Sequence, residues 1–254
     1  MMMFATFLVL FSAVLVLGTQ RSAQLLEPGC LPPNDRQEVD PAPWMAYLVR
    51  QGAYACSGSL ITYNFVLTSG HCADITKNLY VRLGHYQSNG TEDFLVMSVF
   101  RHQRYETIMS DDIALLKLDR SLEGRAKIRP ICILLNPNLR TTIKAIPSFI
   151  LTGWSQTKGD TQQTVRQVLV NRVDPGMNEY WCRKQEERFC CQKPAIFALT
   201  ADPGTPLGGQ VLFDKTPMIV QFGIFSSGHG DTSYGIYTDV NYHTPWIVAT
   251  IRQN

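Results

Sequence analysis

Two polar residues stand at the ends of apolar runs, where their side chains could take part in proton transfer. His71 ends one such run, and Cys72 beside it lies within reach of Cys56 across a predicted hairpin, so a disulfide could hold the imidazole rigidly. Asp112 opens the apolar segment Ile113 to Leu118, and a carboxylate at the mouth of a buried strand needs a partner. Histidine and aspartate can move protons in catalysis. Both can equally be structural, and that alternative stays open on these residues alone.

Other chemical motifs are missing from the sequence. It contains no phosphate-binding loop, no His-Glu-x-x-His zinc helix, no Gly-x-Ser-x-Gly elbow and no dinucleotide fingerprint. Zinc is a competing explanation for the cysteines, but there is no Cys-x-x-Cys pair. The histidines do not lie at ligand spacing either; they are His71, His85, His102, His229 and His243. We therefore expect no cofactor and no metal.

Composition describes a packed globular protein. The 254 residues are 45% hydrophobic and 17% charged, which excludes a disordered chain, and the glycines have no collagen-like period. A net charge of +2 without blocks of like charge gives no electrostatic footprint for nucleic acid or an anionic membrane. Neither partner is expected.

The N-terminus has the pattern of a secretory signal peptide. Residues 1–18 are an apolar stretch too short to span a bilayer comfortably, and small and polar residues follow it. We expect cleavage between Gly18 and Ala23, within a signal segment 1–23, and a secreted, extracellular protein; a signal anchor lacks a charged flank or a longer apolar run. Asn89-Gly90-Thr91 is then a glycosylation acceptor at Asn89. In an oxidising space the seven cysteines can pair, but not all of them internally.

The rest of the chain is punctuated by short apolar or alternating runs, each bounded by Gly, Asn, Asp or Pro. This spacing predicts an antiparallel all-β protein. The runs are Trp44–Val49, Ala55–Ile61, Phe65–Thr68, Leu79–Leu83, Phe94–Phe100, Ile113–Leu118, Phe149–Trp154, Val165–Val173, Met218–Phe225 and Gly235–Val240. A short closing helix is predicted over Pro245–Ile251, with proline in its first turn. Thr141–Ile146 carries few core residues and could join two halves of similar size.

Several segments together resemble the chymotrypsin/trypsin-like serine proteases, in family order from about Pro43 to the end. They are Cys56–Ile61, Val66–Cys72, Asp112–Leu118, Gly153-Trp154, Gly223–Ser226, and Tyr237–Val240 followed by Trp246-Ile247. The resemblance implies two six-stranded antiparallel β-barrels with the active site in the cleft between them and a short C-terminal helix. The family domain would be residues 43–254, preceded by an N-terminal segment, 24–42, tethered by a disulfide.

The same resemblance assigns roles. His71 takes the position of the general base, and Asp112 the position that orients it. It also implies three disulfides: Cys56–Cys72, Cys182–Cys190, and Cys30–Cys132, the last of which would tether residues 24–42. Cys191 is left over, either as a buried inert thiol or as the donor of an intermolecular disulfide.

The family pattern breaks at the nucleophile. The family segment Gly-Asp-Ser-Gly-Gly-Pro-Leu corresponds here to residues 201–207, Ala-Asp-Pro-Gly-Thr-Pro-Leu. Pro203 thus removes the attacking hydroxyl, and because proline has no N–H it also removes one of the two donors to the oxyanion in the loop Ala201-Asp202-Pro203. Loss of one such donor is worth roughly 2.7–4 kcal/mol of barrier. Thr205 is expected to face elsewhere and does not substitute.

The implied specificity pocket departs from the family as well. Its residues would be Phe197, Ser226, Ser227 and Gly228, with the Phe197 ring filling the bottom and Ser227 replacing the family's wall tryptophan. Both ends of the family's disulfide at this pocket are absent, since Leu199 replaces one cysteine and residues 227–231 lack the other. Trypsin-like specificity for arginine or lysine is not expected.

Activation is altered too. Cleavage after Arg36 would expose a glutamine, which cannot bury as an apolar N-terminus. Asp202 would then lack its expected cation, and would point into solvent or pair differently in a zymogen-like loop.

These departures favour a secreted serine protease homologue that works by binding. The resemblance suggests a non-catalytic cofactor, decoy or regulator in extracellular proteolytic cascades, including invertebrate immune ones, with an active protease or its zymogen as partner. His71 and Asp112 would persist as a hydrogen-bonded pair, because removing one leaves the other unsatisfied. The alternative is an active serine endopeptidase that recruits Ser226 or Ser227. A carbohydrate-binding or hydrophobic surface module is a third, without a ring of exposed aromatics to support it.

Overall fold

A computed structural model of the chain describes residues 15–16, 25–31, 42–73, 78–83, 92–125, 127–156, 163–173, 182, 185–193, 202–213, 215–228 and 233–254. The strands are β1 (Leu15–Val16), β2 (Met45–Arg50), β3 (Ala53–Thr62), β4 (Phe65–Thr68), β5 (Leu79–Leu83), β6 (Glu92–Arg101), β7 (Ala114–Leu118), β8 (Ser148–Gln156), β9 (Gln163–Asn171), β10 (Arg188–Gln192), β11 (Pro206–Phe213), β12 (Thr216–Ser227) and β13 (Tyr234–Asp239). The helices are α1 (Arg140–Lys144) and α2 (Val240–Gln253), with 3-10 turns at Pro28–Cys30, Gly70–Ala73 and Pro137–Leu139.

Strands β2 to β7 close into one antiparallel barrel in the order β2-β3-β4-β7-β6-β5. Their alternating side chains place Leu48, Leu60 and Leu115 in a core without exposed surface. The turn from β2 to β3 runs through Gln51 and Gly52, both at positive φ (53° and 78°), which is the backbone that a two-residue hairpin requires. The predicted strand runs of this half of the chain are confirmed.

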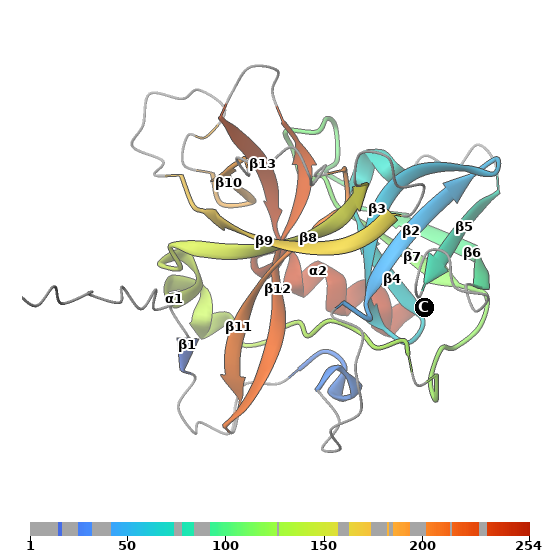
Figure 1. Cartoon of the computed structure of the whole chain (residues 1–254), viewed down its shortest axis with the longest axis horizontal. Coiled ribbons are helices and arrows are strands. Elements are labelled where there is room, and N and C mark those ends of the chain that lie inside the picture. Colours follow the sequence, from blue (N-terminus) through green and yellow to red (C-terminus); the bar gives the residue numbers. More distant parts are fainter. Residues whose placement is uncertain are drawn as a thin grey trace, which may run out of the picture.

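The second sheet has the strand order β10-β13-β12-β11-β8-β9, with β1 paired in parallel to β11. A bridge between Arg172 and Cys191 joins the β9 and β10 edges, so the sheet curls into a second barrel (Figure 1). The predicted two-barrel, all-β architecture is therefore confirmed. The sequence pattern missed β10 and β11, and the latter carries Gly208 and Gly209 with an irregular register, which interrupts the alternation.

The closing helix begins earlier than predicted. α2 starts at Val240, because the Asp239 side chain accepts a hydrogen bond from the Tyr242 N–H (3.0 Å) and caps the helix. Pro245 therefore lies inside α2 and does not open it. Val240 and Ile247 belong to the core of the first barrel, so the last segment of the chain returns from the second barrel to the first (Figure 1).

The two barrels touch through buried polar and aromatic contacts. The Ser59 hydroxyl of β3 donates to Gln221 Oε1 of β12 at 2.7 Å, and the rings of Tyr47 and Trp154 meet edge to face at 5.8 Å between centroids. These contacts fix how side chains from the two barrels face each other. Within the described residues, no helix is both long and apolar enough to span a membrane.

Candidate functional site

His71 and Asp112 meet in the structure through two hydrogen bonds. His71 Nδ1 donates to Asp112 Oδ2 at 2.8 Å, and the His71 backbone N–H donates to Asp112 Oδ1 at 2.9 Å. The Asp112 side chain is fully buried, whereas 25% of the His71 side chain is exposed. The carboxylate thus fixes both the position and the tautomer of the ring, and leaves Nε2 as the proton acceptor.

Local structure brings His71 to this carboxylate. Strand β4 ends at Thr68, and the 3-10 turn Gly70–Ala73 carries His71, while the adjacent Cys72 is bound to Cys56 of β3. A Cβ on Gly70 would lie 3.1 Å from Asp112 Oδ1. Glycine at position 70 therefore permits the close approach of the two segments.

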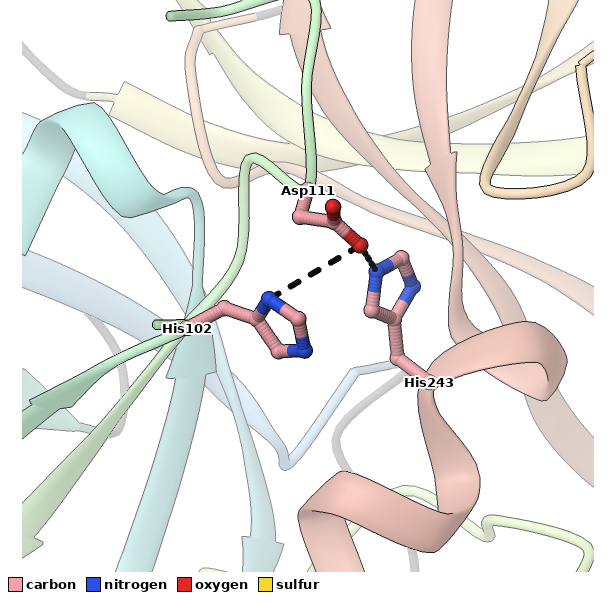
Figure 2. Close-up of side chains that lie close together, drawn as sticks. All are labelled: His102, Asp111 and His243. Atoms are coloured by element: carbon pink, nitrogen blue, oxygen red, sulfur yellow. Dashed lines mark hydrogen bonds and ion pairs between the residues drawn. The ribbon is translucent and has the colours of Figure 1, made fainter. Parts of the chain in front are cut away.

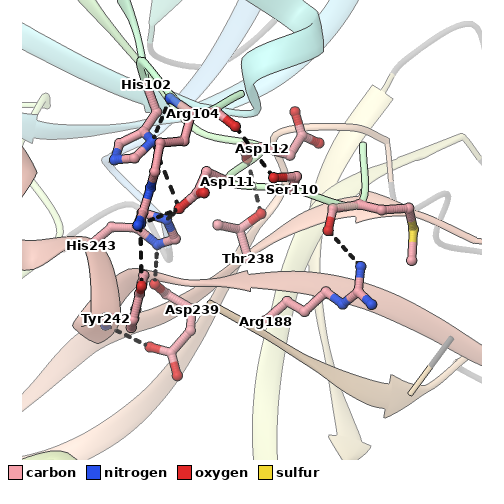
Figure 3. Close-up of polar contacts among 11 residues, drawn as sticks. His102, Arg104, Ser110, Asp111, Asp112, Arg188, Thr238, Asp239, Tyr242 and His243 are labelled. Atoms are coloured by element: carbon pink, nitrogen blue, oxygen red, sulfur yellow. Dashed lines mark hydrogen bonds and ion pairs between the residues drawn. The ribbon is translucent and has the colours of Figure 1, made fainter. Parts of the chain in front are cut away.

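Asp112 is held by its own tight turn just before β7. Asp111 has a positive φ of 43°, and its carbonyl accepts the Ile113 N–H at 2.8 Å. The Thr238 hydroxyl of β13 donates to the Asp112 carbonyl at 2.9 Å, so the second barrel also supports this segment (Figure 3).

Ser226 lies on the other side of the same carboxylate. Its hydroxyl is hydrogen-bonded to Asp112 Oδ2 and lies 2.9 Å from the Ile108 carbonyl, and the residue is only 1% exposed. Ser226 is therefore committed to the acceptor groups around Asp112. Ser227 and Gly228 follow it at the end of β12, and both are more exposed than Ser226.

Pro203 occupies the turn that precedes β11. Its carbonyl accepts the Ser57 N–H of β3 at 2.8 Å, and the next N–H, of Gly204, donates to the Phe225 carbonyl at 2.8 Å. Gly204 has a φ of +87°, and a Cβ there would lie 1.9 Å from the Ser57 carbonyl oxygen. The turn is thus fixed to both barrels, with an imino acid in place of a residue that has a hydroxyl and an N–H.

Asp202 pairs with a residue that the sequence did not indicate. The Tyr54 hydroxyl donates to Asp202 Oδ2 at 2.9 Å and also lies 2.9 Å from Ser57 Oγ. Burial, together with the negative charge of Asp202, raises the pKa of Tyr54, so the phenol stays protonated and can donate. The sequence predicted that Asp202 would either point into solvent or pair with a group other than its expected cation. The structure shows the second outcome, because Asp202 accepts a hydrogen bond from Tyr54. No local signal could reveal it, since 148 positions separate the two residues.

Thr205 does not replace the missing nucleophile. The residue has no exposed surface, and its N–H donates to the Asp202 carbonyl at 3.0 Å. Its hydroxyl finds no hydrogen-bond partner within the described part of the chain.

The structure forms the three disulfides that the family resemblance implied. They are Cys30–Cys132, Cys56–Cys72 and Cys182–Cys190. Cys191 is free and has no exposed surface, and burial raises the pKa of its thiol to about 12. Of the two alternatives for Cys191, the structure favours the buried thiol, because the residue has no exposed surface through which another chain could reach its sulfur.

Some predicted residues lie outside the described part of the chain. They are Arg36, Asn89, Phe197, Leu199, Ala201 and the segment 229–231. Their predicted roles in activation, glycosylation, the pocket and the oxyanion loop stay predictions.

The described site contains a general base, His71, but position 203 offers no nucleophile for it to activate. His71 can accept a proton and Asp112 can stabilise the resulting imidazolium, but position 203 has no hydroxyl to deprotonate. Within the described residues, the only group of potential metal ligands is His102, Asp111 and His243, which adjoins Asp112.

Comparisons with known proteins agree with this geometry. A family profile described as Trypsin matches residues 33–247. "Serine protease grass" of Drosophila melanogaster is 29% identical over 248 residues, covering 84% of this chain but only 65% of that protein. "Trypsin epsilon" of Drosophila erecta is 29% identical (85% of each chain), and "Phenoloxidase-activating factor 3" of Holotrichia diomphalia is 28% identical (83% of this chain, 69% of that protein). A crystal structure of the Drosophila Grass clip serine protease of the Toll pathway shares the fold, with a TM-score of 0.71 at 24% identity over 89% of this chain and 75% of that one.

Proposed function

Because the chain belongs to the trypsin family of serine proteases, we propose that it is a secreted homologue without peptidase activity, which regulates extracellular proteolysis by binding. One observation carries this proposal. Position 203, which aligns with the family's nucleophile, is a proline whose carbonyl is bound to the Ser57 N–H.

Two catalytic contributions are lost together at Pro203. Without a hydroxyl no acyl-enzyme can form, and without an N–H the developing oxyanion loses a donor worth about 2.7–4 kcal/mol, or roughly a 10²–10³-fold change in rate. Ser226 does not compensate, because its hydroxyl is buried against Asp112 and the Ile108 carbonyl. The alternative of an active endopeptidase has the family match and the His71–Asp112 pair in its favour, but it requires a nucleophile that neither Pro203 nor Ser226 supplies.

The retained His71 and Asp112 have a structural explanation. Asp112 accepts two hydrogen bonds from His71 and one from Ser226, so replacing it would strand buried donors. The Tyr54–Asp202 bond supports a non-activated loop, since it uses the carboxylate that an activated family member pairs with its new N-terminus.

Relatives suggest the setting in which such a protein would act. Two of them are named for proteolytic pathways, as a Toll-pathway protease and as a phenoloxidase-activating factor. We place the present chain beside an active protease of such a cascade, or its zymogen, as a non-catalytic partner.

The experiment has two stages. The purified, secreted chain is immobilised and used to capture proteins from its native extracellular fluid, and a captured protease or zymogen is then assayed with and without the chain. The proposal predicts a changed activation rate or turnover of the captured enzyme, with no cleavage by the chain alone. A peptidase activity intrinsic to the chain, or capture of no cascade component, would contradict it.

A further inference from the structure

Three buried side chains from distant parts of the sequence meet beside Asp112. His102 follows β6, Asp111 immediately precedes Asp112, and His243 lies in the first turn of α2; none is more than 7% exposed. The His243 Nε2 and His102 Nδ1 atoms face the same oxygen, Asp111 Oδ1, at 2.9 and 3.7 Å (Figure 2). All three potential ligand atoms lie within 4.8 Å of one another.

Hydrogen bonds define which atoms of His243 carry protons. Its Nδ1 lies 2.7 Å from the Asp239 backbone carbonyl, which can only accept, so Nδ1 carries a hydrogen. In the neutral ring, Nε2 then directs its lone pair at Asp111 Oδ1, which is also an acceptor. Two acceptors at 2.9 Å require a cation between them, either a proton or a metal ion.

The second ring presents an unprotonated nitrogen near the same oxygen. His102 Nδ1 accepts the backbone N–H of Arg104 at 3.3 Å, so it carries no hydrogen itself, and an ion would have to displace this long hydrogen bond to take the single lone pair of the nitrogen. With both rings neutral, two unprotonated imidazole nitrogens and one carboxylate oxygen therefore lie within 4.8 Å of one another.

We propose that His102, Asp111 and His243 form a binding site for a divalent transition-metal ion of the zinc class. Neutral imidazole nitrogens and a carboxylate oxygen are ligands that Zn²⁺ prefers. Tetrahedral bonds of 2.0–2.2 Å place neighbouring ligand atoms about 3.4 Å apart. The two nitrogens lie 2.9 and 3.7 Å from Asp111 Oδ1, on either side of this value, and within 4.8 Å of each other. The Asp239 carbonyl supplies the outer hydrogen bond that orients a metal-binding histidine.

Arg104 is the competing cation at this site. Its Nη2 lies 3.0 Å from Asp111 Oδ1 and 3.2 Å from the Tyr242 hydroxyl (Figure 3). More than half of its side chain (57%) is exposed, so the guanidinium can turn into solvent when an ion binds, without becoming a buried unpaired charge. Removing Arg104 should therefore tighten metal binding.

The site goes beyond the proposed function and departs from the expectation that the chain binds no metal. Sequence spacing could not reveal it, since 132 positions separate Asp111 from His243. An ion held there would connect α2 to the turn that positions Asp112. Metal binding would thus stabilise the segment carrying the retained His71–Asp112 pair.

The test uses the full secreted chain, stripped of metal with a chelator and dialysed against micromolar Zn²⁺. We expect one zinc per chain by elemental analysis, and a Co²⁺-substituted form with the absorption of a tetrahedral site. His102→Gln, Asp111→Asn and His243→Gln should each weaken binding about tenfold or more. Arg104→Gln should strengthen it, and His85→Gln, which alters a histidine other than the two ligands, should leave it unchanged.

Failure of the wild-type chain to retain zinc would overturn the proposal and assign the cation at Asp111 as a proton. Zinc binding that the three ligand substitutions leave unchanged would overturn it as well. Should the ligand variants fail to fold, Arg104→Gln decides, because its exposed side chain leaves the core and the three ligands intact. Unchanged or weaker zinc binding in that variant contradicts the site.

Discussion

Asp112 accepts hydrogen bonds from two atoms of His71, its backbone N–H and its Nδ1–H, while Ser226 donates to the same carboxylate. The aspartate is fully buried and the histidine ring is partly exposed. The two residues therefore differ in structural importance. The Asp112 carboxylate is the common acceptor of several hydrogen bonds, whereas the His71 ring supplies only one of the donors.

This asymmetry predicts unequal losses of stability. Asp112→Ala leaves buried donors without an acceptor and should lower the free energy of unfolding by about 3 kcal/mol or more. His71→Ala should lower it by only about 1 kcal/mol. Urea unfolding of the two variants measures both values. Equal losses would show that the ring, and not only the carboxylate, is a structural element.

The turn at Gly204 predicts a steric effect that a matched glycine can isolate. Gly204 and Gly52 both have positive φ, but only a Cβ at position 204 meets neighbouring atoms, within 1.9 Å of the Ser57 carbonyl. Gly52→Ala should cost about 1 kcal/mol for backbone strain, and Gly204→Ala clearly more than about 2 kcal/mol. Thermal unfolding of both variants compares them; similar melting temperatures would mean that the Gly204 turn is not packed against β3.

Stability should depend on pH through His102. The pKa of His102 in the folded chain lies below the ordinary value of 6.5. Between these two pKa values, His102 is protonated in the unfolded chain and neutral in the folded one. The unfolded chain therefore gains stability relative to the folded chain as it takes up this proton. The folded chain has its full stability above pH 6.5 and loses part of it as pH falls from 6.5 towards the folded pKa of His102. In chelator-treated samples, His102→Gln should lose stability less steeply over that window. Parallel curves for the two proteins would exclude His102 as the titrating group.

Restoring the hydroxyl alone should not restore catalysis. Pro203→Ser returns a nucleophile and an N–H, yet the Tyr54–Asp202 bond remains, and so do the pocket and activation segments that we expect to differ from the family. We expect no hydrolysis by this variant across a peptide library. A double variant, Pro203→Ser with Tyr54→Phe, checks whether the phenol holds Asp202 away from an activated arrangement. Turnover by the single variant would show that the departures outside position 203 matter little.

Much of the fold could be predicted from the sequence because apolar alternation marks most strands directly. The first barrel matched its predicted runs, since its strands are bounded by turn residues and alternate regularly. Two strands escaped the pattern for local reasons. Gly208 and Gly209 interrupt the alternation of β11, and β10 spans only five residues around Cys190 and Cys191. The start of α2 was misplaced because the proline signal at Pro245 outweighed the capping role of Asp239.

The candidate site also contains residues that the sequence could predict and residues that it could not. His71, Asp112 and Pro203 lie in segments whose order resembles a known family, so the sequence could predict their roles. Tyr54 and the His102–Asp111–His243 cluster carry no local signature, because tertiary folding alone brings their side chains together.

The central claim, that position 203 leaves the chain without a nucleophile, is tested most directly with a serine-directed phosphonate and intact-mass analysis. The purified chain is treated before and after cleavage at Arg36, with an active trypsin-family protease as the control. We predict full labelling of the control and no mass increase on this chain in either form. A stoichiometric phosphonate adduct on any of its serines, together with peptide hydrolysis that the adduct abolishes, would contradict the account.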